Sequence, residues 1–402
     1  MRQIIAEKIL DTLDTRHLKA AQQPEWSDPL QVRRVRSILA ARPPLVRAED
    51  VDALRSLLAH VAVGDAHILQ CGDCAEDPEE CTAEHIGRKS AVLDLLAGAL
   101  KLSTRKPVLR VGRIAGQYTK PRSNNTETVD GVELPVYRGH MINSPEPDAE
   151  SRRPDPLRIL TGYMAANDIM EHLGWRNPTT PQARLITEPH VWTSHEALLL
   201  DYELPMIRTL ADGTRWLSST HWPWIGERTR QVDGAHVALL AGVVNPISCK
   251  VGPNMAVDEL LELSERLDPD REPGRLTFIA RMGAGTVAER LPKLVEAVRR
   301  AGHPVIWLSD PMHGNTISTP DGRKTRLLET IAQEIGEFKR AVAAGGGVAG
   351  GLHLETTPDE VTECAADGTA LGGVGDRYAS LCDPRLNPWQ AVSVISAWSD
   401  SD

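Results

Sequence analysis

The chain has 402 residues, of which 41% are hydrophobic and 25% are charged, so it is long enough to bury a full core. Its formal net charge of −10 argues against a general binder of nucleic acid or of anionic membranes. No apolar run approaches the roughly 18 residues of a membrane-spanning helix, and six cysteines are too few for a disulfide framework, so we expect a cytoplasmic protein.

The N-terminal region is predicted to be a helical extension over residues 1–65. Its first stretch, MRQIIAEKILDTLDTRH, is charged throughout and lacks the apolar centre of a signal peptide, so we predict a helix over 1–20. Two more helices are predicted over Pro29–Ala41 and Arg47–Val61, with the breaker Arg42-Pro43-Pro44 between them.

From about residue 67, short apolar runs alternate with helical patterns, which is typical of a parallel sheet. Eight strands are predicted, over His67–Gly72, Pro107–Val111, His190–Ser194, Arg215–Ser219, Ile247–Val251, Arg275–Ile279, Pro304–Leu308 and Val348–Leu354. Helices are predicted over Ala83–Lys101, Asp155–Leu173, Asp233–Val243, Met255–Leu267, Thr286–Arg300 and Lys324–Ala344. We therefore predict an α/β fold, a (β/α)8 TIM barrel over 66–402, in a single domain over 1–402.

One predicted loop, Gln117–Pro156, is long, polar and rich in Pro, Asn and Ser. A loop of this length inside a compact domain is usually a lid, a binding loop or disordered. It follows the second strand, on the side where the other candidate groups are expected.

Several strand ends carry groups that could bind a metal ion. Strand one ends in Cys71-Gly-Asp-Cys74-Ala-Glu76, strand seven in Asp310 and His313, and strand eight in His353 and Glu355, with Asp383 after its helix. A thiolate, an imidazole and two carboxylates would suit Mn, Co, Fe or Zn. Each residue alone could instead be a satisfied polar group near a sheet edge, and the two cysteines could be a redox pair or part of a zinc site.

Cations follow other strands and suggest an anionic ligand. These residues are Arg113, Lys120 and Arg122 after strand two, Lys250 after strand five and Arg281 after strand six. Buried cations need partners, and the strand-end acids look too few to pair them all, so phosphates or carboxylates of a substrate are the expected partners. The alternative is that each cation forms a structural ion pair.

The residues at these strand ends resemble one family. The matching runs are GDCAE (72–76), RIAGQYTKPRS (113–123), WIGERTRQVDGAH (224–236), KVGPN (250–254), RMG (281–283), DPMHGNT (310–316), GGLHLETT (350–357) and CDPRLNPWQA (382–391). They look like class II, plant-type, 3-deoxy-D-arabino-heptulosonate 7-phosphate (DAHP) synthases, and the resemblance runs from about Trp26 to Trp398.

The resemblance implies a (β/α)8 barrel and a transferase. The expected reaction condenses phosphoenolpyruvate with erythrose 4-phosphate and water, giving DAHP and phosphate, and it is the first step of the shikimate pathway. The family requires a divalent metal ion, with Mn²⁺ expected here before Co²⁺, Fe²⁺ or Zn²⁺. Motif by motif, the implied metal ligands are Cys74, His313, Glu355 and Asp383.

The resemblance also assigns the substrate contacts. Phosphoenolpyruvate would be held by Arg113, Lys250 and Arg281, in a pocket lined by Trp224, Glu227 and Arg228. Erythrose 4-phosphate would meet Lys120, Pro121, Arg122 and Ser123. In this reading the metal acts as a Lewis acid on the aldehyde, Glu227 could orient the attacking water, and Lys250 or a metal-bound group could move protons.

The chain departs from the family pattern in two respects. Tyr137-Arg138-Gly139-His140 has a histidine where an acid is expected. The chain is also short for the class, and in the family the extra segments carry sites for aromatic amino acids. We therefore expect weak or absent feedback inhibition, and short members resemble those that supply secondary metabolism, such as phenazine-type products.

Other features stay open at the level of sequence. Cys382 precedes the proposed ligand Asp383, so oxidation could join it to Cys74, although a buried inert thiol is the simpler reading. A homodimer or homotetramer that associates through the N-terminal helices is expected from the resemblance, with no nucleic-acid or membrane partner. The alternatives are a metal-dependent barrel aldolase with another aldose acceptor, or a barrel without catalytic activity.

Overall fold

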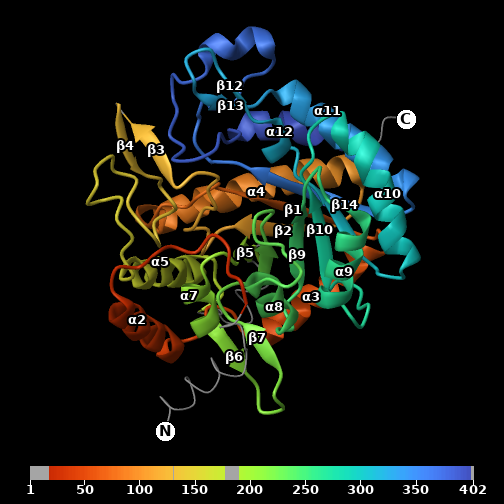
Figure 1. Ribbon diagram of the computed structural model, residues 1–402. Coiled ribbons are helices and arrows are strands. Elements are labelled where there is room, and N and C mark those ends of the chain that lie inside the picture. Colours follow the sequence, from red (N-terminus) through yellow and green to blue (C-terminus); the bar gives the residue numbers. More distant parts are fainter. Residues whose placement is uncertain (1–17, 130, 177–189, 400–402) are drawn as a thin grey trace. The chain divides into compact units, whose positions relative to one another are not determined.

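A computed structural model describes residues 18–129, 131–176 and 190–399 of the chain. Eight strands close into a barrel in the order β1-β14-β11-β10-β9-β8-β5-β2 (Figure 1). The barrel strands are β1 (His67–Gly72), β2 (Val108–Arg113), β5 (Trp192–Glu196), β8 (Trp222–Ile225), β9 (Ile247–Val251), β10 (Leu276–Ala280), β11 (Ile306–Ser309) and β14 (Val348–Glu355). Their pairing is parallel, for example β1 with both β2 and β14. The predicted (β/α)8 barrel is confirmed.

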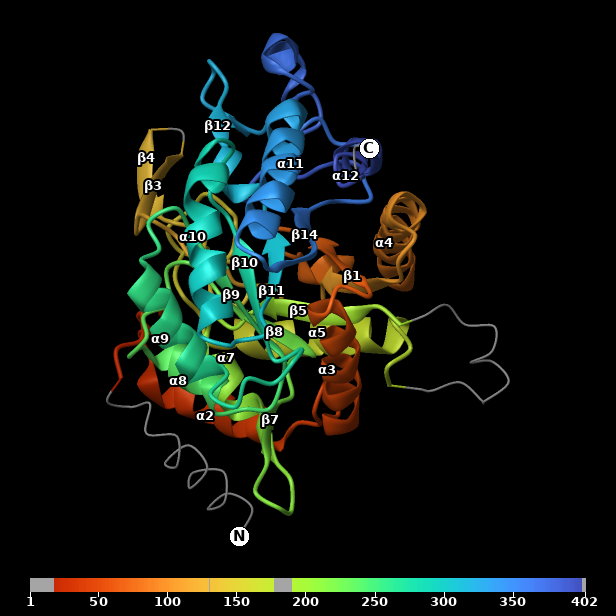
Figure 2. The same ribbon diagram turned by 90° about the vertical axis from the view of Figure 1, so that its right-hand side faces the viewer.

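The barrel strands are buried along most of their length because helices cover their outer side. Every residue of β9, β10 and β11 is buried, as expected for a parallel sheet that meets water on neither face. Helix α10 (Thr286–Arg300) has the complementary pattern and lies beside α11 (Leu328–Ala344) in both ribbon views (Figures 1 and 2). Its buried positions recur every three or four residues, at Val287, Leu291, Leu294, Val295 and Val298.

Most predicted helices form with ends shifted by a few residues. They are α2 (Pro29–Ala41), α3 (Ala48–Ala62), α4 (Ala83–Thr104), α5 (Arg158–His172), α8 (Ala235–Ala241), α9 (Val257–Leu267), α10 and α11. Helix α2 begins where the Asp28 side chain accepts hydrogen bonds from the first turn, at Leu30 N and Gln31 N. The helix predicted over 1–20 falls mainly on 1–17, outside the described residues.

The predicted fourth strand, Arg215–Ser219, is wrong as a barrel strand. Residues Arg215–Leu217 form β7, which pairs antiparallel with β6 (Ile207–Thr209). The turn between them contains Asp212-Gly213, an ordinary hairpin sequence, and Gly213 has φ +90°. The barrel position belongs to β8, whose Pro223 lacks an N–H for the sheet and so conceals the strand in the sequence.

Two loops also differ from expectation. The loop Gln117–Pro156 contains a small sheet in which β3 (Thr126–Val129) pairs antiparallel with β4 (Val132–Pro135). The expected helix before Asp383 is wrong, because only a 3-10 turn, η5 (Gly368–Gly373), lies there. The helix comes later as α12 (Pro388–Ser396), which begins at a capping box formed by Asn387 and Gln390.

The described chain divides into two compact units. Unit 1 contains the described residues of Met1–Val51, Ala75–Ile86 and Ile114–Asn245, and unit 2 contains those of Asp52–Cys74, Gly87–Arg113 and Pro246–Asp402. The division into an extension over 1–65 and one barrel domain over 66–402 stays a prediction.

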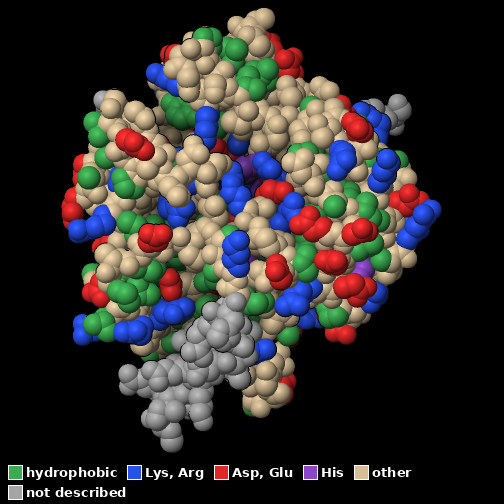
Figure 3. Space-filling model, viewed as in Figure 1, with side chains coloured by type: hydrophobic (Ala, Val, Ile, Leu, Met, Phe, Trp, Pro, Cys, Tyr) green, Lys and Arg blue, Asp and Glu red, His purple; other side chains and the backbone are tan. Residues whose placement is uncertain are grey.

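The surface of unit 2 over α9 and α10 carries interspersed acidic and basic side chains (Figure 3). One acidic and basic pair on this surface is Arg300 and Glu296 of α10, with 2.7 Å between Nη2 and Oε1. Such a mixed face is typical of helices that meet solvent. Among the described residues we find no helix whose length and hydropathy would let it cross a bilayer.

Candidate active site

Three of the four proposed metal ligands lie together in unit 2. Ligand atoms of His313, Glu355 and Asp383 are all within 4.8 Å of one another. His313 opens a 3-10 turn, η4 (His313–Asn315), that follows β11, and Glu355 is the last residue of β14. Ends of parallel barrel strands meet at one edge, which explains how residues distant in sequence come together.

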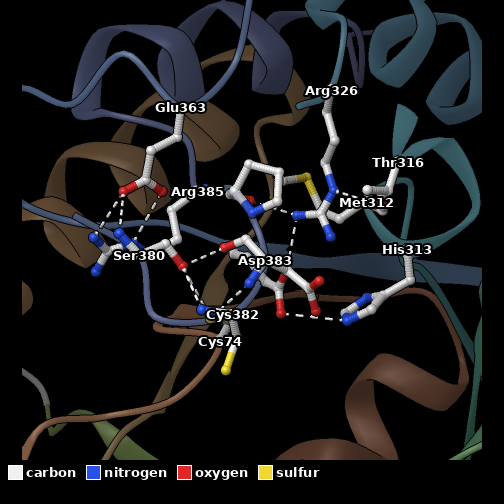
Figure 4. A network of polar contacts seen from close by, with 12 residues as sticks. Cys74, Met312, His313, Thr316, Arg326, Glu363, Ser380, Cys382, Asp383 and Arg385 are labelled. Atoms are coloured by element: carbon white, nitrogen blue, oxygen red, sulfur yellow. Dashed lines mark hydrogen bonds and ion pairs between the residues drawn. The ribbon is translucent and has the colours of Figure 1, made fainter. Parts of the chain in front are cut away.

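The fourth proposed ligand, Cys74, lies just beyond the end of β1. Its Sγ accepts a hydrogen bond from the backbone N–H of Asp383 at 3.4 Å, and its side chain is buried (Figure 4). The thiolate is the form of cysteine that binds metal. One sulfur, one imidazole nitrogen and two carboxylates fit Mn²⁺, Co²⁺, Fe²⁺ or Zn²⁺.

The imidazole of His313 is oriented by Asp310. His313 Nδ1 lies 2.8 Å from Asp310 Oδ2, while Nε2 points to Glu355 Oε1 at 3.3 Å. Burial acts to raise the pKa of Asp310, but the neighbouring His313 and Lys250 hold that pKa well below its usual range. A carboxylate on Nδ1 leaves Nε2 for a metal ion, the usual arrangement of a ligating histidine.

Glu355 is completely buried and is neutralised by two arginines. Its Oε1 lies 3.0 Å from Arg113 Nη2, and its Oε2 lies 2.7 Å from Arg326 Nη1. Arg326 also donates to Pro384 O at 2.6 Å. The two guanidinium groups offset the cost of burying this carboxylate and fix both of its oxygens.

Arg113 is held from three sides. Besides Glu355, its Nε donates to Asp73 O at 3.0 Å and its Nη1 donates to His353 Nε2 at 2.7 Å. His353 Nδ1 donates to Gln70 Oε1 at 2.6 Å, which leaves Nε2 as an acceptor. Burial lowers the pKa of His353 well below its usual value, in agreement with a neutral ring.

The expectation that these cations lack acidic partners is wrong for Arg113 and Lys250. Lys250 forms a buried ion pair with Asp310, as Arg113 does with Glu355. Burial lowers the pKa of Lys250 to about 8, with Asp310 opposing and Arg113 and Arg281 adding to the effect. Arg281 donates from Nη2 to the His313 carbonyl oxygen at 3.4 Å. All of these residues belong to unit 2.

The proposed aldehyde-substrate residues Lys120, Pro121, Arg122 and Ser123 lie in unit 1. Arg122 Nη2 is 3.0 Å from Glu127 Oε2, so this cation also has an acidic partner. Ser123 Oγ accepts from Arg228 Nη2 at 2.6 Å. The unit thus brings Arg228, from the motif after β8, to the loop that carries Ser123.

The remaining proposed phosphoenolpyruvate residues, Trp224 and Glu227, also belong to unit 1. Trp224 is a buried residue of β8. Glu227 Oε1 lies 2.9 Å from Arg230 Nη2. Its Oε2 is buried without a hydrogen-bond partner among the residues that the structure describes, so it can accept from a bound water.

The other residues singled out in the sequence take structural positions. Burial raises the pKa of the Cys71 thiol to about 12, which argues against a reactive redox pair with Cys74. His140 lies edge-on to Tyr137 and 3.9 Å from Asp77 Oδ1, and burial lowers its pKa. All six cysteines are free thiols.

Sequence reasoning missed several charged residues around the ligands. They are Arg326, which binds Glu355; Lys324, whose Nζ is 2.8 Å from Asp383 Oδ1; and Glu363 with Arg385, which hold the segment around Asp383. Arg385 could have been found, because it lies in the run CDPRLNPWQA. The other three stand outside any recognisable run.

Comparisons with known proteins point to one family. A profile described as the class-II DAHP synthetase family matches residues 11–180 and 165–397. A probable phospho-2-dehydro-3-deoxyheptonate aldolase from Pseudomonas fluorescens is 60% identical over 380 residues, with 94% of each chain covered.

More distant relatives have the same name. A phospho-2-dehydro-3-deoxyheptonate aldolase from Streptomyces coelicolor is 40% identical over 426 residues, covering 94% of each chain. The aldolase AroG from Mycolicibacterium smegmatis is 38% identical over 447 residues, covering 97% of this chain and 94% of its own. The solved structure of the aldolase from Francisella tularensis has a TM-score of 0.55 at 14% identity, covering 91% and 95% of the two chains, a likeness of fold alone.

Proposed function

The chain belongs to the class-II DAHP synthetase family, and we propose from this membership that it condenses phosphoenolpyruvate with erythrose 4-phosphate and water, releasing DAHP and phosphate. It is a DAHP synthase, a transferase that stands at the entry to the shikimate pathway. The 60% identity over nearly the whole of both chains carries this assignment.

We propose that the reaction depends on a divalent metal ion, Mn²⁺ before Co²⁺, Fe²⁺ or Zn²⁺. The observation that supports it is the convergence of His313, Glu355 and Asp383 within 4.8 Å, with Cys74 Sγ hydrogen-bonded to Asp383 N. When bound, such an ion supplies Lewis-acid stabilisation of the negative charge that develops on the aldehyde oxygen.

The phosphate and carboxylate of phosphoenolpyruvate call for several cations, which Arg113, Lys250 and Arg281 supply in unit 2. Arg113 is held by Asp73 O and His353 as well as by Glu355, so it stays oriented when an anion replaces Glu355. Trp224, Glu227 and Arg228 complete the proposed contacts of this substrate.

Erythrose 4-phosphate is proposed to meet Lys120, Pro121, Arg122 and Ser123, where the two cations suit its phosphate. Two residues have proposed proton roles. Glu227 orients the water that adds to phosphoenolpyruvate, because its buried Oε2 can accept a hydrogen bond. Lys250, with a pKa of about 8, can give up a proton near neutral pH.

We further propose that the enzyme supplies secondary metabolism with little feedback control. The alignments to the Streptomyces and Mycolicibacterium relatives extend over 426 and 447 positions, more than the 402 residues of this chain. Those relatives therefore carry segments that this chain lacks, and in the family such segments bind aromatic amino acids. The alignment to the Pseudomonas relative needs no such insertions to span 94% of both chains.

A homodimer or homotetramer is also proposed. Helix α2 exposes Leu30 and Ile38, at 60% and 42% of their surfaces, which suits contact with a second copy. The six free thiols favour the cytoplasm as its compartment. Light scattering of the purified protein tests the oligomer.

The decisive experiment is phosphate release by the purified protein given phosphoenolpyruvate, erythrose 4-phosphate and Mn²⁺. We expect release to need both substrates and to disappear with EDTA and in Cys74→Ala. Release with a different aldose but not with erythrose 4-phosphate would replace the proposed acceptor. Absence of both release and metal binding in the folded protein would favour a barrel without catalytic activity.

A further inference from the structure

Asp383 occupies a segment without helix or strand, between η5 and α12. Its proposed role as a metal ligand requires the carboxylate to stay in place relative to Cys74, which is 309 positions away in sequence. Ligand placement of this kind depends on neighbouring groups that hold the ligands. The structure contains such groups in a buried chain of four charged side chains.

Glu363 organises the segment from within. Its carboxylate is fully buried and accepts from the backbone N–H groups of Ala379 at 3.1 Å, Ser380 at 2.8 Å and Arg385 at 2.6 Å. It also accepts from the Arg385 guanidinium, at 3.0 Å from Nη2 and 3.2 Å from Nε. One carboxylate therefore draws both ends of residues 379–385 together, with Asp383 between them.

Arg385 joins this segment to the end of β1. Its Nη1 lies 2.7 Å from Asp73 Oδ1, and Asp73 immediately precedes Cys74. Lys89 of α4 binds the other oxygen of Asp73 at 2.8 Å. The charges alternate from Lys89 through Asp73 and Arg385 to Glu363, and each side chain is at least about nine-tenths buried.

Ser380 connects Glu363 with both proposed ligands, Cys74 and Asp383 (Figure 4). Its Oγ donates to Asp383 O at 2.6 Å, accepts from Cys382 N at 3.3 Å and lies 3.4 Å from Cys74 Sγ. Because its backbone N–H binds Glu363, a shift of that carboxylate would move contacts to Cys74 and Asp383 together.

We propose that Glu363 and Arg385 are positioning residues of the metal site, which fix the Asp383 segment against Asp73 so that Cys74 and Asp383 bind the same ion. Glu363 is not itself a ligand, since both of its oxygens already accept hydrogen bonds from the segment. The inference rests on the proposed metal dependence and adds the residues that build the site.

The test uses the purified full-length protein, stripped of metal and titrated with Co²⁺. Absorption by a cobalt–thiolate bond reports Cys74 directly, and competition with a chelator gives the dissociation constant without any assay of activity. In Glu363→Gln, which keeps the side-chain shape, we expect binding about 10–100-fold weaker and a diminished thiolate band. The matched control is Asp268→Asn, another buried carboxylate of unit 2, which accepts from Glu272 N and should leave the Co²⁺ affinity unchanged.

The outcomes are separable. A folded Glu363→Gln protein that binds Co²⁺ with wild-type affinity and a full thiolate band overturns the positioning role. A wild-type protein that binds no Co²⁺ overturns the metal site itself, and this inference with it. If Glu363→Gln does not fold, Arg385→Lys tests the positioning role instead. Lysine keeps the positive charge but loses the bidentate contact with Glu363, so this variant should weaken Co²⁺ binding in the same way.

Discussion

Arg113 and Glu355 form a buried ion pair, with Nη2 3.0 Å from Oε1, and the same oxygen lies 3.3 Å from His313 Nε2. Arg113, which is proposed to bind phosphoenolpyruvate, and Glu355, which is proposed to bind the metal ion, thus neutralise each other's charge. A metal ion bound at Glu355 would compete with the Arg113 guanidinium for Oε1. The released guanidinium could then bind an anion. Metal and phosphoenolpyruvate should therefore bind cooperatively.

This coupling predicts that Mn²⁺ tightens the binding of phosphoenolpyruvate by about 5–150-fold. Because linkage is reciprocal, phosphoenolpyruvate should tighten Mn²⁺ binding by the same factor. Calorimetric titration of each ligand, with and without the other, measures both factors. Independent binding of the two ligands would contradict the proposed exchange at Glu355.

Lys250 should make the activity decrease at basic pH. Burial lowers its pKa to about 8, so the ammonium is present below that pH and is lost as the pH rises through it. If the cation binds phosphoenolpyruvate, kcat/KM should fall above about pH 8. In Lys250→Arg the residual activity should not show this decrease, since arginine stays protonated. If the decrease in activity above about pH 8 is unchanged in Lys250→Arg, that decrease belongs to the titration of another group.

Replacement of Arg122 should change the KM of one substrate only. Replacing it with alanine removes a charge proposed to meet the phosphate of erythrose 4-phosphate, so KM for that substrate should rise about 10-fold or more. The KM for phosphoenolpyruvate should stay within a factor of two or so. Arg153→Ala is the control, because Arg153 is an exposed arginine of the same predicted loop, paired with Glu150. Equal effects on both substrates would argue against this assignment.

Aromatic amino acids should have little effect on the enzyme. Phe, Tyr and Trp, added singly and together at millimolar concentration, are expected to leave the initial rate of phosphate release nearly unchanged. The Mycolicibacterium relative, whose alignment to this chain requires insertions, is a suitable comparison. Strong inhibition of the present enzyme would mean that the missing segments are not needed for control.

Gly351 is predicted to stabilise the barrel by letting β14 approach β1 closely. Its φ is +148°, and a Cβ there would lie 1.9 Å from Ile68 O of the neighbouring strand. Gly351→Ala should therefore lower the free energy of unfolding by about 1–3 kcal/mol or more. Gly368→Ala is the matched control, since a Cβ at Gly368 meets nothing within 4 Å. Thermal unfolding of the two variants separates local strain from the general effect of an added methyl group.

The sequence predicts the barrel well where burial is continuous along the chain. The strand Ile247–Val251 is found with its correct ends because five residues in a row are buried. The strand Trp222–Ile225 escapes detection because Pro223 breaks the local rule, while the neighbouring run Arg215–Leu217 has the pattern of a strand and forms a hairpin. Local pattern identifies strands but does not say which of them pair in the barrel.

For the site, strand ends indicate which side chains come together but not how their charges balance. The expectation of unpaired cations is wrong for Arg113 and Lys250 because their partners come from other strands, as with Lys250 and Asp310, 60 positions apart. Glu363 and Asp73 are joined through Arg385, and Asp73 is 312 positions from that arginine. No local pattern records such tertiary pairing.

All four proposed metal ligands, together with Arg113, Lys250 and Arg281, belong to unit 2, whereas the Lys120–Ser123 segment belongs to unit 1. These two sets of residues can be varied separately in a gene library if Ser123 is kept, because Ser123 accepts a hydrogen bond from Arg228, a proposed phosphoenolpyruvate residue of unit 1. Directed evolution toward other phosphorylated aldoses can be confined to the loop after β2, while the metal ligands and the proposed phosphoenolpyruvate residues are left unchanged. The same division offers a route to new seven- or eight-carbon sugar acids from one scaffold.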